Sequence, residues 1–204
     1  EHFLIVDPEE RKQMILQGMQ KLADEKGGTI IMDEDLLEEV VFLVEYPTAL
    51  CGEFDREFLQ LPEAAIITPM KDHQRYFPMR DKDGKLMNLF LTVRNGDDYH
   101  LETVQHGNER VLRARLDDAK FFFEEDKKKK LIDRVDDLQR IVFQDGLGTL
   151  KDKAQRLEQI TTFLNHKLDL GLDDGDLTRL SDRANIDLLT ERGADFTELP
   201  VDIG

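Results

Sequence analysis

The stretch that most constrains the fold is a β-hairpin near the middle of the chain. Residues 76–80 and 86–93 are both rich in strand-forming residues, and Asp-Lys-Asp-Gly-Lys separates them. An Asp-Gly pair between two such runs is typical of a hairpin turn, because glycine readily adopts the left-handed backbone that tight turns require. A lone hairpin is marginally stable in water, so we expect helices to pack against it.

Helices are predicted on both sides of the hairpin. Asp7 before Pro8, and Asp33 farther on, are typical N-cap residues, and apolar residues recur at helical spacing after each. A helix is also expected over residues 62–75, with a kink or break at Pro69. Later helices are expected over residues 108–126, 131–143, 150–168 and 177–190.

These elements predict an α+β fold class. A small antiparallel sheet with a hairpin is packed by helices and followed by an all-helical C-terminal part. Gly146 and Gly148 separate two helical stretches, which favours a domain boundary there. The 204 residues suffice for one or two domains, and we expect an α+β domain over 1–148 and a helical segment over 149–204.

Composition narrows the classes of partner. The net charge of −16 argues against nonspecific binding of nucleic acid over the whole surface, and no DNA partner is expected. No apolar run approaches the roughly 20 residues of a membrane helix, so no membrane partner is expected. One cysteine, Cys51, excludes an internal disulfide framework. Because the chain opens at Glu1 without a methionine, we expect it to be part of a longer polypeptide.

Residues 70–95 form a locally basic island in this acidic chain, with six Lys or Arg against three Asp. Within it, His73, Gln74, Arg75 and Tyr76 are contiguous. Arginine offers a planar fork to phosphate and tyrosine a ring on which a base can stack, so the group is a candidate RNA contact. The alternative is a plain helix end, in which His73 and Arg75 complement the C-terminal dipole.

A second candidate anion surface lies on the helix predicted from Asn108. Arg110 and Arg113 follow His106 and Asn108, and the start of a helix offers free backbone N–H groups to an anion. The alternative is that these arginines pair within the helix, for example Arg113 with Asp117.

No catalytic or metal-binding set emerges. The chain has no Walker A sequence, Rossmann glycine fingerprint, nucleophile elbow or HExxH motif, and its five histidines are scattered. The Asp-rich loop at 173–176 lacks the 12-residue spacing and closing Glu of a calcium loop. No catalytic residue and no metal site are therefore predicted.

Several phrases of this sequence also belong to a known family. The longest are Met70–Pro78 (MKDHQRYFP) and Gly107–Leu116 (GNERVLRARL), with Val93–Gly96 (VRNG) between them. In these and shorter phrases over about residues 3–165, the chain resembles the β subunit of the bacterial heterotetrameric glycyl-tRNA synthetase. Residues 184–204 look like the start of that family's HD-type helical domain, although no His-Asp dipeptide supports an HD metal site.

The resemblance implies a role in the ATP-dependent ligation of glycine to its tRNA in the cytoplasm. In this family, the α subunit of an α2β2 assembly holds the ATP and glycine site, where ATP and Mg are expected, and the β subunit mainly engages tRNA. The present chain is therefore expected to need no cofactor of its own and to be inactive alone. The alternative function is a purely structural subunit-interface module without RNA contact. A stand-alone HD-type hydrolase is the third and last of the functions considered.

The matched motifs carry a set of residues expected to contact either the glycine tRNA or a neighbouring subunit such as the α subunit. They are His73, Gln74, Arg75, Arg94, Asn95, Asn108, Arg110 and Arg113.

Overall fold

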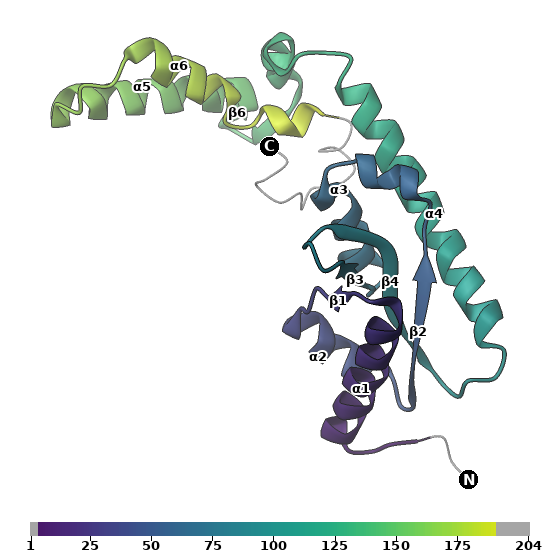
Figure 1. Cartoon of the computed structure of the whole chain (residues 1–204). Coiled ribbons are helices and arrows are strands. Elements are labelled where there is room, and N and C mark those ends of the chain that lie inside the picture. The colour runs from purple at the N-terminus through teal and green to yellow at the C-terminus, as the bar shows by residue number, and fades with distance from the viewer. Residues whose placement is uncertain (1–3, 191–204) are drawn as a thin grey trace. The chain divides into compact units, whose positions relative to one another are not determined.

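The computed structural model of the chain describes residues 4–190 and divides into two compact units (Figure 1). The first runs through Lys120 and the second begins at Phe121, within helix α4 (Leu101–Asp126). The domain boundary expected between residues 148 and 149 falls inside the second unit and stays a prediction. Of residues 184–204, which look like the start of an HD-type helical domain, 191–204 lie outside the described residues.

The first unit is built on a four-stranded antiparallel sheet. Its strands lie in the order β1 (Thr29–Ile30), β3 (Phe77–Arg80), β4 (Leu86–Asn95) and β2 (Pro47–Glu53). β2 pairs with β4 along its whole length. Together with the helices that cover it, this sheet confirms the predicted α+β fold.

The predicted hairpin is formed by β3 and β4. Gly84 has a φ of +79°, the left-handed backbone expected for the Asp-Gly turn. Its N–H donates to the carbonyl of Asp81 at 3.0 Å. The Asp81 carboxylate accepts the N–H groups of Asp83 and Lys85, each at 2.9 Å. The turn is thus held by one aspartate, as the Asx preference of tight turns predicts.

The first two helices begin at the N-cap residues that the sequence predicts. α1 (Pro8–Lys26) is capped by Asp7, which accepts the N–H of Glu9 at 2.9 Å, and it ends at Gly27 with a φ of +67°. α2 (Glu34–Leu43) is capped by Asp33, which accepts the N–H of Leu36 at 3.0 Å. Each cap satisfies a backbone donor that the helix leaves unpaired.

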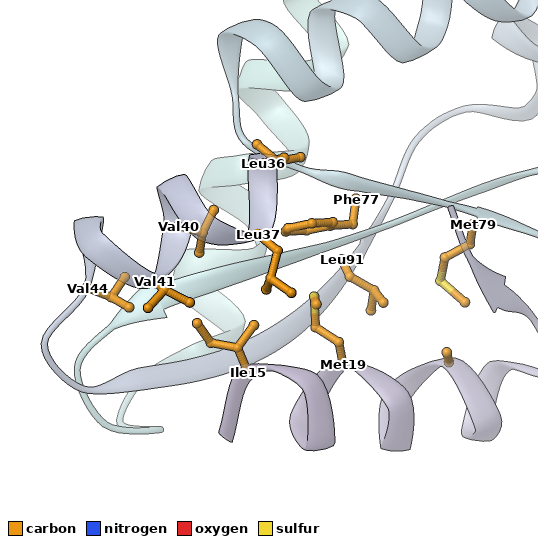
Figure 2. Close-up of a cluster of buried hydrophobic side chains, with 11 residues drawn as sticks. Ile15, Met19, Leu36, Leu37, Val40, Val41, Val44, Phe77, Met79 and Leu91 are labelled. Atoms are coloured by element: carbon orange, nitrogen blue, oxygen red, sulfur yellow. The ribbon is translucent and has the colours of Figure 1, made fainter. Parts of the chain in front are cut away.

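The core of this unit lies between α1, α2 and one face of the sheet. Figure 2 shows side chains of α1 and α2 pointing toward those of the strands. Residues four apart on α1, such as Ile15 and Met19, present one apolar stripe, and both are fully buried. The cluster comprises Ile15, Met19, Ala23, Leu36, Leu37, Val40, Val41, Val44, Phe77, Met79 and Leu91.

The opposite face of the sheet has its own buried layer. Leu91 belongs to the α1–α2 core, so its neighbour Phe90 points the other way. The Phe90 ring stacks on Tyr76 with 4.5 Å between ring centroids. Leu112 and Leu116 of α4 are also fully buried, as is Phe58 on the 3-10 helix η1 (Arg56–Gln60).

Two helices of this unit differ from the sequence prediction. The expected helix over 62–75 changes type at Pro69, with α3 (Glu63–Thr68) followed by a π-helix, η2 (Pro69–His73). The predicted break at Pro69 is thus confirmed, because proline cannot donate the usual α-helical hydrogen bond. The prediction that a helix begins at Asn108 is wrong. α4 begins at Leu101 and continues through Gly107, which tertiary packing tolerates.

The second unit contains a hairpin that was not predicted. An α-helix was expected over 131–143, but residues Leu131–Arg140 form a 3-10 helix, η3. The chain then forms β5 (Val142–Gln144) and β6 (Gly148–Thr149), which pair antiparallel. Helical spacing of apolar residues cannot reveal such a pairing. Of the two glycines that seemed only to end a helix, Gly146 lies in the turn and Gly148 begins β6.

The remaining helices of this unit match their predicted positions more closely. α5 (Leu150–Leu168) follows the prediction, and its start carries a capping box between Thr149 and Asp152. The helix predicted over 177–190 is instead α6 (Asp174–Arg183), capped by Asp173, and a 3-10 turn, η4 (Ile186–Leu189).

Candidate functional site

The predicted site residues do not form one surface, because they lie on both faces of the first unit's sheet. Gln74, Arg75 and Asn95 line a pocket of about 330 Å³ beside α2, called here the α2 pocket. Arg110 and Arg113 line another of about 280 Å³ beside α4, called here the α4 pocket. The family phrases therefore contribute to two separate candidate sites.

Arg75 is held firmly at the α2 pocket. Its Nε and Nη2 atoms each lie 2.8 Å from Oε1 of Glu39 on α2, and its Nη1 donates to the backbone carbonyl of Asp72. Its backbone has a φ of +56°, a conformation that costs a non-glycine residue about 1 kcal/mol. The guanidinium is thus committed to groups of its own chain rather than left free for a phosphate.

Asn95 fixes the loop that connects α2 to β2. Its Oδ1 accepts the N–H groups of Glu45 at 3.0 Å and Tyr46 at 3.1 Å. The next residue, Gly96, donates its N–H to the carbonyl of Tyr46 at 2.7 Å. An asparagine oxygen has two lone pairs and can satisfy both donors at once. The Arg-Asn-Gly phrase therefore has a clear structural role at this position.

The α2 pocket has apolar walls and a few polar groups. Val40, Leu43 and Val93 supply apolar surface, and the side chains of Gln74 and Asn95 supply amides. Binding sites for apolar groups commonly have this composition, in which a few polar groups set the orientation. The pocket suits an apolar side chain of a neighbouring protein better than it suits a phosphate, because its arginine is already paired.

The α4 pocket is more polar. His106 lines it together with Arg110 and Arg113. Arg113 pairs with Asp55, which precedes η1, and not with Asp117 as the alternative reading expected. Sequence spacing suggested Asp117, which lies four residues farther along the helix. It could not show a contact with a residue 58 positions away.

Glu109 also lines the α4 pocket and joins α4 to β2. Its Oε1 accepts the backbone N–H of Glu53 at 3.0 Å and the side-chain amide of Gln105 at 2.8 Å. Burial alone would raise the pKa of Glu109, but these hydrogen bonds and one from His106 lower it below its ordinary value. The carboxylate therefore stays charged, and the pocket is lined by three acids, Glu53, Asp55 and Glu109, beside its two arginines.

The other predicted residues lie outside both pockets. Arg94 pairs with Asp97 at 3.7 Å and donates to the carbonyl of Tyr99. His73 is exposed at the end of η2. Asn108 lies half-buried within α4, so the anion site expected at a helix start there is wrong, because those N–H groups are inside the helix.

The basic island of residues 70–95 is largely neutralised by nearby carboxylates. Four of its six cations form ion pairs: Lys71 with Asp33, Arg75 with Glu39, Arg80 with Glu63 and Arg94 with Asp97. The hydrogen bond from Lys71 lowers the pKa of Asp33, and that from Arg80 lowers the pKa of Glu63. All four acids lie outside residues 70–95 in the sequence. The charges within the window alone therefore overstated the local positive charge.

Within residues 4–190, no group of three or more His, Cys, Asp or Glu side chains is placed to hold a metal ion. Cys51 is half-buried, and burial raises the pKa of its thiol. None of the helices in the described part of the chain combines the length and the apolar character needed to cross a bilayer.

Comparison with known proteins gives one consistent result. The family model described as glycyl-tRNA synthetase beta subunit matches residues 1–203. A glycine–tRNA ligase beta subunit of Desulforamulus reducens is 45% identical over 203 residues, which are 99% of this chain and 29% of that protein. The corresponding proteins of Listeria welshimeri and Desulfitobacterium hafniense are 48% and 44% identical over 98% and 97% of this chain. Each of these matches likewise covers 29% of the relative's length.

The family match and the identities to these relatives thus place the chain among the subunits of aminoacyl-tRNA synthetases. More narrowly, the chain belongs to the glycyl-tRNA synthetase beta subunit family. It spans about 29% of the length of the curated relatives it matches.

Proposed function

We propose that the chain is part of a glycine–tRNA ligase β subunit that engages tRNA and scaffolds the α subunit. The family match over residues 1–203 is the observation that carries this proposal. Under this proposal, the α subunit of an α2β2 enzyme in the cytoplasm holds the site for ATP, Mg and glycine. The present chain supplies no catalytic group. The chain alone should therefore form no glycyl-tRNA when given ATP, glycine and tRNA, and detectable activity would contradict this assignment.

Contact with tRNA is assigned to the α4 pocket. Arg110 is exposed there, and among residues 4–190 it has no ion-pair partner. An unpaired arginine keeps its planar fork available to a phosphate oxygen, whereas Arg113 and Arg75 are already paired. Arg110 is therefore the predicted residue best placed to meet RNA.

The alternative, a structural subunit-interface module without RNA contact, is supported by the charge distribution. Four of the six cations in the 70–95 island are paired, and the chain carries a net charge of −16. A surface of this kind attracts RNA weakly, and the α2 pocket has the apolar walls of a protein contact.

Charge reversal at Arg110 in the complete ligase tests which function holds. Arg110→Glu should lower kcat/KM for tRNA several-fold, because a phosphate contact becomes a repulsion, and should leave glycyl-adenylate formation unchanged. Arg115→Glu is the matched control, since Arg115 is exposed on the same helix about 140° around its axis. Equal tRNA kinetics in both variants and the wild type would favour the structural alternative.

A further inference from the structure

Helix α5 has two packing faces, of which one lacks a partner in the second unit. Its buried residues Ala154 and Asn165 lie on one side of the helix. Leu150, also buried, lies in the same direction as position 168. Beside this buried face, side chains at positions 160, 163, 164 and 168 fall within an arc of about 140°, at 100° per residue. These side chains are Ile160, Phe163, Leu164 and Leu168, exposed by 55%, 60%, 42% and 61%.

The loop after α5 carries two more exposed leucines. Asn165, only 4% exposed, donates its Nδ2 to the carbonyl of Leu172 at 2.8 Å and accepts the Leu172 N–H at 3.0 Å. The backbone N–H of Leu170 also donates a hydrogen bond to the carbonyl of Asn165 at 3.1 Å. The loop is thus fastened by a buried side chain, while its own Leu170 and Leu172 stay 54% and 53% exposed.

The chemistry of this stripe favours an apolar protein partner. The six residues at positions 160, 163, 164, 168, 170 and 172 carry no charge, and the Nζ of Lys167 lies 5.4 Å from the centre of the Phe163 ring. Contiguous apolar patches on soluble proteins mark interaction sites. RNA is bound chiefly through its phosphates, for which these leucines offer nothing.

We infer that the α5 stripe, together with Leu170 and Leu172, packs against the part of the β-subunit polypeptide that lies outside this chain. The chain accounts for 29% of each of the three relatives named above, so most of a β subunit is available to cover the stripe within the same molecule. Contact within one polypeptide avoids the loss of translational freedom that a separate partner would cost. This inference rests on family membership and requires neither tRNA contact nor α-subunit scaffolding.

Photo-crosslinking in the complete β subunit, purified with and without its partners, tests the occupant. A benzophenone amino acid at Phe163 should crosslink to β-subunit peptides outside the 204 residues of this chain, as mapped by mass spectrometry. The same probe at Gln155, exposed on the same helix and turned away from the middle of the stripe, should not crosslink to those peptides. Crosslinks from Phe163 to tRNA, to an α subunit, to a second β subunit or within this chain would overturn the inference. Equal crosslinking from Gln155, or none from Phe163, would do the same.

A substitution experiment provides an independent readout. Phe163→Ser with Leu168→Ser should lower the unfolding temperature of the complete β subunit by several degrees, because buried apolar contacts are lost. In the 204-residue chain by itself, the same pair should change the unfolding temperature little, since both side chains are already more than half exposed. Equal effects in the two proteins would show that the remaining polypeptide does not cover the stripe.

Discussion

Glu39 on α2 holds the guanidinium of Arg75, with 2.8 Å between Glu39 Oε1 and Arg75 Nη2. The Arg75 side chain remains 38% exposed and that of Glu39 44%, and solvent weakens such a pair. A double-mutant cycle of Arg75→Ala and Glu39→Ala, measured by urea unfolding, should therefore give a coupling energy of about 0.5–1 kcal/mol. A coupling indistinguishable from zero would mean that the pair does not form in solution.

The left-handed backbone of Arg75 leads to a second prediction about the same residue. Arg75→Ala and Arg75→Gly both remove the ion pair, but glycine adopts a φ of +56° without the steric cost that alanine keeps. The glycine variant should therefore be more stable than the alanine variant by about 1 kcal/mol. Chemical denaturation of the two proteins side by side measures this difference, and an alanine variant of equal or greater stability would refute the strain.

Two glycines should respond in opposite directions to the same substitution. A Cβ added at Gly52 would lie 2.4 Å from the Phe90 ring, which is fully buried and cannot move aside. Gly52→Ala should therefore destabilise the fold by about 1–3 kcal/mol.

Gly107 is the matched control, because it is exposed on α4 and a Cβ there meets nothing within 4 Å. Gly107→Ala should stabilise the fold by up to about 1 kcal/mol through helix propensity. Thermal unfolding of both variants checks the pair, and a neutral Gly52→Ala would show that the sheet relaxes around Phe90.

Asn95 should be needed for stability through its oxygen alone. Asn95→Ala removes the acceptor used by the N–H groups of Glu45 and Tyr46 and should cost about 1–2 kcal/mol. Asn95→Asp keeps an oxygen at that position and should retain most of the stability. If the aspartate variant is as unstable as the alanine variant, the amide nitrogen also matters, which would point to a contact in the α2 pocket.

The sequence predictions that rest on a few adjacent residues were correct, and those that depend on tertiary packing were not. The caps at Asp7 and Asp33, the Asp-Gly turn and the break at Pro69 were predicted correctly, because each follows from a few adjacent residues. The start of α4 was placed seven residues too late, since the helix continues through Gly107, whose low helix propensity tertiary packing overrides. The β5–β6 hairpin was missed because its pairing overrides an apolar period that fits a helix.

The candidate site was less predictable than the fold. The partners of Arg75 and Arg113 are Glu39 and Asp55, which lie 36 and 58 positions away in the sequence. A window of charges cannot reveal such pairs, so a stretch that reads as basic is nearly neutral in space. Arg110 is the exception, because its position on an exposed helix face follows from the period of α4, and it remains unpaired among residues 4–190.

The last prediction concerns stability at high pH. Tyr76 is 4% exposed, and burial raises its pKa from 10 to about 12 because the charged phenolate is poorly solvated there. Below pH 10 the hydroxyl is neutral in both the folded and the unfolded chain, so Tyr76 ionisation takes nothing from the free energy of unfolding. Between pH 10 and about 12 the unfolded chain loses this proton first, so stability falls, by up to roughly 2–3 kcal/mol.

The variant Tyr76→Phe isolates this effect, since it keeps the ring that stacks on Phe90 and removes the ionisable group. Other groups titrate equally in both proteins, so the difference in unfolding free energy between them should change with pH in favour of phenylalanine above pH 10. Urea titrations at pH 9, 10.5 and 12 measure that difference. A constant difference across the range would show that water reaches the Tyr76 hydroxyl and that its burial does not control the ionisation.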